Sequence, residues 1–78
     1  MEKAVLKVTR ECIIEIPIKV GDVIEYYEAA FPRKGKITYI FDGGNRAIVD
    51  DKDTVFLSYI SSINNVKVKD IKGKVILI

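Results

Sequence analysis

The chain has 78 residues and a net charge of +2, from 13 basic and 11 acidic side chains. A chain this short forms one domain, and its core is too small to enclose a deep substrate cavity. It has no histidine and one cysteine, so the usual general bases and nucleophile pairs are missing. We therefore expect a single domain over residues 1–78 with no enzyme activity, no cofactor and no bound metal.

The apolar composition predicts an all-β fold. The sequence contains nine valines and thirteen isoleucines, and β-branched side chains favour pleated strands. Charges interrupt every apolar run before it reaches the roughly 20 residues of a membrane helix, so we expect a cytoplasmic protein. Cys12 adjoins two isoleucines and is expected to be a buried, unreactive side chain, as suits a reducing compartment. The many charges and few amides are typical of thermophiles, archaea among them.

Two strands are predicted at the N-terminal end, over residues 4–8 and 11–18. In the second, alternate residues of the segment 14–18 are isoleucines and share one face. Residues 9–10 allow a tight turn between the two strands. Pro17 has no backbone donor, so that end of the second strand is expected at a sheet edge or terminus.

The next segment is predicted to be a turn, a strand and a loop, over residues 19–22, 23–27 and 28–33. Pro32 favours extended geometry in the residue before it. Alanine and glutamate favour helices, so a short helix over residues 23–31 remains an alternative.

A β-hairpin over residues 35–51 is the central predicted feature. Its strands, 36–41 and 46–50, flank Asp42-Gly43-Gly44-Asn45. Glycine adopts positive φ at little steric cost, and aspartate and asparagine suit turns, so two β-rich runs around this cluster predict a hairpin.

The C-terminal part is predicted to add further short strands. Seven or so short strands at close spacing are typical of a small barrel or sandwich, and a barrel removes exposed edges. The predicted segments are a turn at 51–53, a strand at 54–60, a 3₁₀ turn within 61–65, a strand at 66–69, a turn at 70–73 and a strand at 74–78.

Parts of this sequence resemble the KOW motif. In that motif a Gly-Asp pair opens a strand, as at Gly21-Asp22, and a Gly-Lys step opens the next, as at Gly35-Lys36. An apolar return strand follows, as at residues 45–49, and from residue 35 to 51 the pattern matches without a gap. The loop before Gly35 departs from the pattern, because it lacks the extra glycine that many KOW loops carry. The resemblance covers less than half of the 78 residues.

The KOW resemblance implies a small SH3-like antiparallel barrel of about five to seven short strands. It also implies a role in binding RNA or protein within ribosomes or transcription elongation complexes. We therefore expect a non-catalytic RNA-binding module, such as a small ribosomal or ribosome-associated protein.

Two sets of basic residues are the candidate RNA contacts, because cations neutralise phosphates and exposed rings stack on bases. The alternative is that alternating lysines form only the solvated face or a guarded edge of a sheet, and that the rings belong to the core. Lys7 would join the second set if the last strand returned beside the first. The first set is Arg33, Lys34, Lys36 and Arg46, with Phe31 and Tyr39 as aromatic contacts, and the second is Lys67, Lys69, Lys72 and Lys74.

Other functions stay open at this point. The apolar run Val75–Ile78 suits either closure of the barrel or a protein partner, including a homodimer, and Tyr26, Tyr27 and Phe56 suit an interface. A small-barrel DNA-binding chromatin protein is a third possibility, although a higher charge than +2 is expected for one. The adjacent Asp50 and Asp51 point to opposite faces of a strand, so they do not suggest a catalytic pair.

Overall fold

The structure is a computed structural model that describes residues 1–9 and 12–76. These residues form nine strands and three 3₁₀ turns, without an α-helix, so the predicted all-β class is confirmed and the alternative helix over 23–31 is wrong. The elements are β1 (Lys3–Thr9), β2 (Ile13–Lys19), β3 (Val23–Glu28), β4 (Phe31–Phe41), η1 (Asp42–Gly44), β5 (Arg46–Val49), β6 (Asp53–Phe56), η2 (Leu57–Tyr59), β7 (Ile60–Ile63), β8 (Val66–Lys67), η3 (Val68–Asp70) and β9 (Lys74–Ile76).

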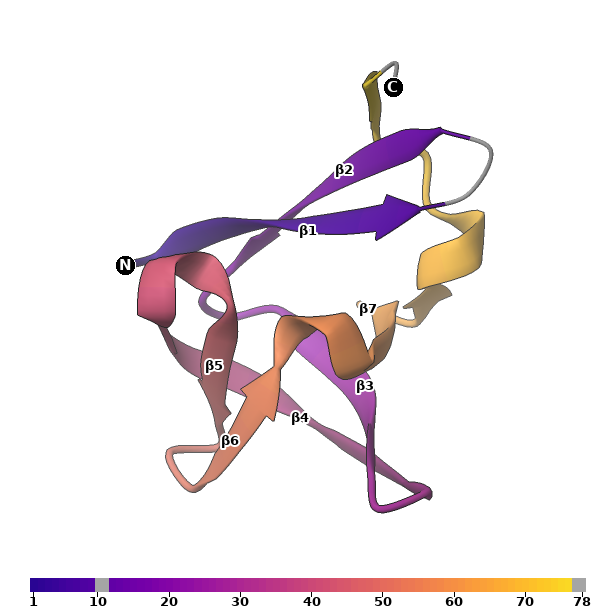
Figure 1. Ribbon diagram of the computed structural model, residues 1–78. Helices are drawn as coiled ribbons and strands as arrows, with labels where there is room; N and C mark the ends of the chain where they lie inside the picture. The colour runs from indigo at the N-terminus through magenta and orange to yellow at the C-terminus, as the bar shows by residue number, and fades with distance from the viewer. Residues whose placement is uncertain (10–11, 77–78) are drawn as a thin grey trace.

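The strands form two antiparallel sheets. One has the order β1-β2-β9, and the other has the order β6-β5-β4-β3-β7-β8. Figure 1 shows β1 and β2 lying across the strands of the larger sheet. No ladder joins the two sheets among the described strands, so closure into one continuous barrel is not observed there.

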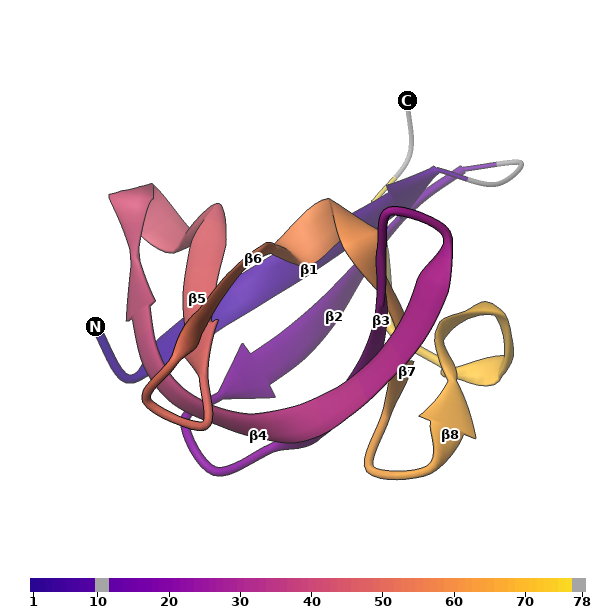
Figure 2. The same ribbon diagram turned by 90° about the horizontal axis from the view of Figure 1, so that it is seen from below.

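The long strand β4 gives the larger sheet its curvature. It pairs with β3 along its first half and with β5 along its second half, and the register shifts between Ile37 and Tyr39. This bulge is supported by Thr38, whose hydroxyl donates to the Ile48 carbonyl at 3.2 Å and accepts from the Asp51 amide at 3.1 Å. A bulge bends its strand, and Figure 2 shows β4 as one curved strand running from the β5 end of the sheet to the β3 end.

The core lies between the two sheets. The predicted isoleucine face of β2 is confirmed, and these side chains meet the inner residues of β3, β4 and β5. Cys12 packs half-buried against the same core. β9 pairs only with residues 13–15 of β2, so Pro17 faces an open edge on that side, as predicted. The buried core residues are Leu6, Ile14, Ile16, Ile18, Ile24, Tyr26, Ile37, Ile40, Ala47, Val49, Val55, Leu57, Ile60 and Ile63.

Asp22 connects the two sheets at the corner between β2 and β3. Its side chain is buried, and its carboxylate accepts from the Lys19 amide at 2.9 Å and from the Asn64 side-chain amide at 3.1 Å. Its backbone carbonyl accepts from the Ile37 amide at 2.9 Å. The Gly-Asp pair of the sequence therefore fixes the positions of β2, β4 and the β7–β8 turn relative to one another.

Four predicted elements differ in the structure. The predicted loop over 28–33 is a two-residue turn at Ala29 and Ala30, after which β4 begins at once. The predicted strand 54–60 is interrupted by η2, whereas the 3₁₀ turn predicted within 61–65 is a strand followed by a turn. The predicted strand 66–69 ends at residue 67, where η3 begins. The turn predicted at residues 9–10 includes residue 10, which lies outside the described residues.

The Ala29-Ala30 turn is strained. Both residues have positive φ, 48° and 71°, which an L-residue with a Cβ adopts at a cost of about 1 kcal/mol. The equivalent turn between β7 and β8 uses Asn64 and Asn65, at φ of 49° and 67°. Asparagine tolerates this conformation because its short polar side chain bonds locally, and alanine has no such compensation.

Replacing Ala30 by glycine is therefore expected to stabilise the protein. Removal of the Cβ relieves the strain at positive φ, and the greater freedom of glycine in the unfolded chain reduces the gain to about 0.5 kcal/mol. Urea unfolding of both proteins measures the difference. Ala4→Gly is the control, because Ala4 lies within β1 without positive φ, and there the same change should destabilise by about 0.5–1 kcal/mol. Equal losses in the two variants would contradict the strain argument.

Candidate nucleic-acid interface

Lysines from both predicted sets meet around one groove beside β3, β7 and β8. The groove has a volume of about 420 Å³, and Lys67 and Lys69 line it together with Asn65. Lys34 extends from β4 to the same place, where its ammonium donates to the Asn65 side-chain oxygen at 3.1 Å. We call Lys34, Lys67, Lys69 and the polar residues between them the lysine groove.

The charge and hydrogen-bonding groups of the lysine groove suit an anion. Its one carboxylate, on Glu25, accepts from the Ser62 hydroxyl at 2.9 Å, and the Ser61 hydroxyl donates to the Glu25 carbonyl at 3.2 Å. Three ammonium groups outnumber this carboxylate. A phosphate placed in the groove would meet a net positive charge, and the Asn65 amide could donate to it.

A second surface lies on the side of β4, β5 and β6 that faces away from the core. In the sheet register Arg46 is opposite Phe41 on one side and Phe56 on the other. The guanidinium carbon of Arg46 lies 5.0 Å from the centre of the Phe41 ring and 5.8 Å from that of Phe56. The Tyr39 and Phe41 rings lie nearly parallel, 6.0 Å apart. We call Tyr39, Phe41, Arg46 and Phe56 the aromatic face.

The aromatic face can present rings and charge to a ligand. Tyr39 is 51% exposed and Phe56 is 49% exposed. Arg46 is held in place by Asp42, whose carboxylate oxygen lies 3.0 Å from its Nε. Unstacked bases pack on such rings and on guanidinium planes, and the contact is largely independent of base type.

β4 joins the aromatic face to the lysine groove. Tyr39 and Phe41 stand at one end of the strand, and Lys34 and Lys36 stand at the other end, all away from the core. From residue 34 to residue 41 the strand extends for roughly 23 Å, at about 3.3 Å per residue. An extended single strand of nucleic acid could therefore contact both surfaces along this path.

No protein-family model matches the chain, and comparisons with curated proteins and with solved structures find no match. The KOW resemblance thus stays a prediction from the residues that carry it. The structural roles of those residues are clear, since Gly21 and Asp22 form the corner between the sheets.

The first predicted basic cluster is divided in the structure. Successive residues of a strand point to opposite faces, so Arg33 lies on the other side of the β3–β4 hairpin from Lys34. It is opposite Tyr26 in the register and lies 3.7 Å from the Glu28 carboxylate. Phe31, at the start of β4, is 69% exposed, so it is a surface residue rather than a core one.

The C-terminal lysines are also divided. Lys74 lies on β9 in the three-stranded sheet, opposite Glu15, whereas Lys67 lies on β8 in the six-stranded sheet. Lys7 is opposite the same glutamate from β1, so Lys7 and Lys74 flank one carboxylate. Lys72 stands in the segment just before β9 and does not line the lysine groove.

Phe41 is the residue of the aromatic face that the sequence analysis missed. It was assigned only to the end of a predicted strand. The signal was present, because a short turn over residues 42–45 makes residues 41 and 46 opposite partners in the hairpin. Arg46 could therefore have been expected to pack on the Phe41 ring.

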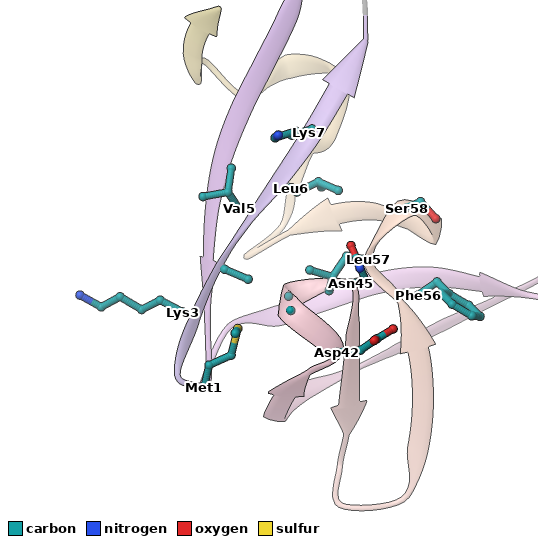
Figure 3. A pocket seen from close by; sticks show the side chains of 13 residues that line it. Met1, Lys3, Val5, Leu6, Lys7, Asp42, Asn45, Phe56, Leu57 and Ser58 are labelled. Carbon is teal, nitrogen blue, oxygen red and sulfur yellow. The ribbon is translucent and has the colours of Figure 1, made fainter.

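A groove of about 780 Å³ runs between β1 and the turns η1 and η2 (Figure 3). It borders one edge of β1, which pairs with β2 alone. In Figure 3, Leu6 points into the groove, whereas Lys3 points away from it and Phe56 points away from β1. The groove therefore offers an unpaired strand edge together with both polar and apolar side chains.

The described residues contain no group of three or more acidic or cysteine side chains able to hold a metal ion. In the same part of the chain, no helix has the length and apolar character required to cross a membrane.

Among the described residues, Tyr26 has the one clear pKa shift. Burial raises the pKa of its hydroxyl above the ordinary value of 10.0, and the nearby carboxylates of Asp53, Glu28 and Asp50 raise it further, against an opposing effect of Arg33. The folded protein therefore holds this proton more tightly than the unfolded chain does.

This shift predicts a loss of stability at alkaline pH. The contribution of Tyr26 is fully present below pH 10 and disappears as the pH rises through the higher folded-state pKa. The free energy of unfolding, measured with urea at about pH 8 and about pH 11, should fall less in Tyr26→Phe than in the unchanged protein. Tyr59→Phe is the control, because Tyr59 is 58% exposed, and an equal fall in all three proteins would contradict the prediction.

Proposed function

We propose that the protein is a non-catalytic module that binds single-stranded or looped RNA in the cytoplasm. The observation that carries the proposal is the continuous path along β4, from the rings of the aromatic face to the ammonium groups of the lysine groove. Phosphates would bind the lysines, and splayed bases would stack on Tyr39 and Phe56. The KOW resemblance supports a ribosomal or ribosome-associated setting.

Two features favour single-stranded RNA over duplex DNA. Stacking on exposed rings requires bases that are free of their own stack, as in single strands and loops. The net charge of +2 is also low for a protein that wraps duplex DNA through its phosphates alone.

Fluorescence polarisation with a labelled single-stranded RNA and a labelled DNA duplex tests the proposal. If the RNA makes four phosphate contacts, its affinity should fall about 50-fold between about 50 and about 200 mM salt. The reason is that each contact adds about 0.7 to the slope of the logarithm of affinity against the logarithm of salt concentration. Duplex DNA should bind more weakly than the RNA at both salt concentrations. The absence of RNA binding at the lower salt concentration, or an affinity independent of salt, would contradict the proposal.

A protein-interaction module is the second candidate. Val75 on β9 is 55% exposed although it belongs to an apolar run, and β9 is the edge strand of its sheet. Residues 77–78 of this run lie outside the described residues. If copies of the chain associate through this edge, Val75→Lys should convert a dimer to a monomer in sedimentation velocity. An unchanged oligomeric state in that variant would exclude this edge as the interface.

A further inference from the structure

A third groove combines aromatic rings with carboxylates. It has a volume of about 300 Å³ and lies between the end of β3 with its turn and the start of β6 with η2. Tyr27 is 54% exposed and Tyr59 is 58% exposed, and the Phe56 and Tyr59 rings meet edge to face at 5.8 Å. We call it the acidic groove, formed chiefly by Tyr26, Tyr27, Glu28, Asp53, Phe56 and Tyr59.

The floor of the acidic groove offers a hydroxyl without a partner. Tyr26 is only 3% exposed, and its hydroxyl makes no hydrogen bond within the described part of the chain. Every fully buried side-chain oxygen of the described residues has a hydrogen-bond partner. Because the Tyr26 hydroxyl has none, it is not fully buried and reaches the groove rather than ending in the core. A buried tyrosine usually has a partner for this group, and here a ligand can provide it.

The charge around the acidic groove is negative. Glu28 and Asp53 line it from β3 and β6, and Lys52 is the one basic side chain in its lining. Arg33 lies beside Glu28 at 3.7 Å, but both side chains are more than half exposed, so this pair is weak. Three carboxylates, including that of Asp50, act on the Tyr26 hydroxyl against one guanidinium. The groove therefore suits a cation, in contrast to the lysine groove.

We propose that the acidic groove binds the guanidinium group of an arginine side chain from a partner protein. A guanidinium stacks on aromatic faces and carries five N–H donors in a planar fork. It can therefore pack on the Tyr59 ring while donating to the carboxylates of Glu28 and Asp53 and to the Tyr26 oxygen. This inference is independent of RNA binding, because Tyr26, Glu28, Asp53 and Tyr59 lie outside both the aromatic face and the lysine groove.

The test uses the whole protein, labelled with ¹⁵N, in NMR titrations with short Gly-Ser peptides that carry one arginine, one citrulline or one lysine. Citrulline has nearly the shape of arginine but no charge. The arginine peptide should shift the amides of Glu28, Asp53 and Tyr59 and should bind at least about tenfold more tightly than the citrulline peptide. The lysine peptide should bind more weakly than the arginine peptide, because it cannot stack or donate as a fork. Equal binding of the arginine and citrulline peptides would overturn the proposal.

Two variants locate the binding. Tyr26→Phe keeps the buried ring and should weaken the arginine peptide about fivefold, and Asp53→Asn should weaken it about tenfold. Asp51→Asn is the matched control, since it removes the same charge from a neighbouring exposed residue outside the groove. The amide spectra report whether each variant is folded. Arginine binding unchanged in both variants would refute the site.

RNA affinity separates this proposal from the RNA-binding proposal. Tyr26→Phe and Asp53→Asn should bind RNA as the unchanged protein does, because both residues lie outside the proposed RNA path. If the protein binds RNA but not the arginine peptide, only the arginine proposal fails. If it binds the peptide but not RNA, only the RNA proposal fails.

Discussion

Replacing Lys34, Lys67 and Lys69 together by alanine is expected to weaken RNA binding about 30-fold, since roughly 0.7 kcal/mol per exposed charged contact amounts to about 2 kcal/mol for three. The three side chains surround one groove, although they come from β4, β8 and η3. The slope of the logarithm of affinity against the logarithm of salt concentration should also become shallower, by about 2. Fluorescence polarisation at several salt concentrations measures both effects.

The control for this variant removes three other lysines. Lys7→Ala, Lys72→Ala and Lys74→Ala together change the net charge by the same amount, but none of these residues lines the lysine groove. This control should lower RNA affinity only slightly, through the general charge of the protein. If both triple variants lose the same affinity, the lysine groove is not the phosphate site.

Gly35→Ala is expected to destabilise the protein by about 2 kcal/mol, because a methyl group there overpacks the core. It would overlap the Val49 side chain, which is 1% exposed, and the carboxylate of Asp50. Asp50 accepts from the Lys36 amide at 3.0 Å, so displacing it also disturbs the contact between β4 and the β5–β6 turn. The melting temperature should fall by about 10 °C in thermal unfolding.

Gly43→Ala separates this packing effect from backbone strain. Gly43 has a φ of +65°, and a Cβ there meets nothing within 4 Å. The variant should lose only about 1 kcal/mol, the cost of a left-handed conformation for an L-residue. A Gly35→Ala variant no less stable than Gly43→Ala would show that close packing does not require glycine at position 35.

The strands and the core could be predicted from the sequence because both follow local patterns. The alternating isoleucines of β2 point to the core, and the Asp-Gly-Gly-Asn turn predicted the β4–β5 hairpin correctly. The Ala29-Ala30 turn could not be predicted, since neither residue favours positive φ. Its conformation is imposed by the pairing of β3 with β4, which more than offsets the local cost.

The candidate sites were harder to predict, because they depend on which strands become neighbours. Lys34 approaches Asn65 only because β3 pairs with both β4 and β7. Arg33 was grouped with Lys34 from their adjacency in sequence, but adjacent residues of a strand face opposite ways. The acidic groove joins β3 to β6, which are not neighbours in the sheet, so no short-range pattern indicates it.

The corner at Asp22 has a consequence for how the molecule opens. Separation of the sheets would break the bonds from the Lys19 amide and the Asn64 side chain to its carboxylate, and the bond from the Ile37 amide to its carbonyl. These contacts involve β2, β4 and the β7–β8 turn, so neither sheet can detach without loosening the other. The amide protons of Lys19 and Ile37 should therefore exchange with solvent at the rate of global unfolding, and the domain should behave as a single cooperative unit.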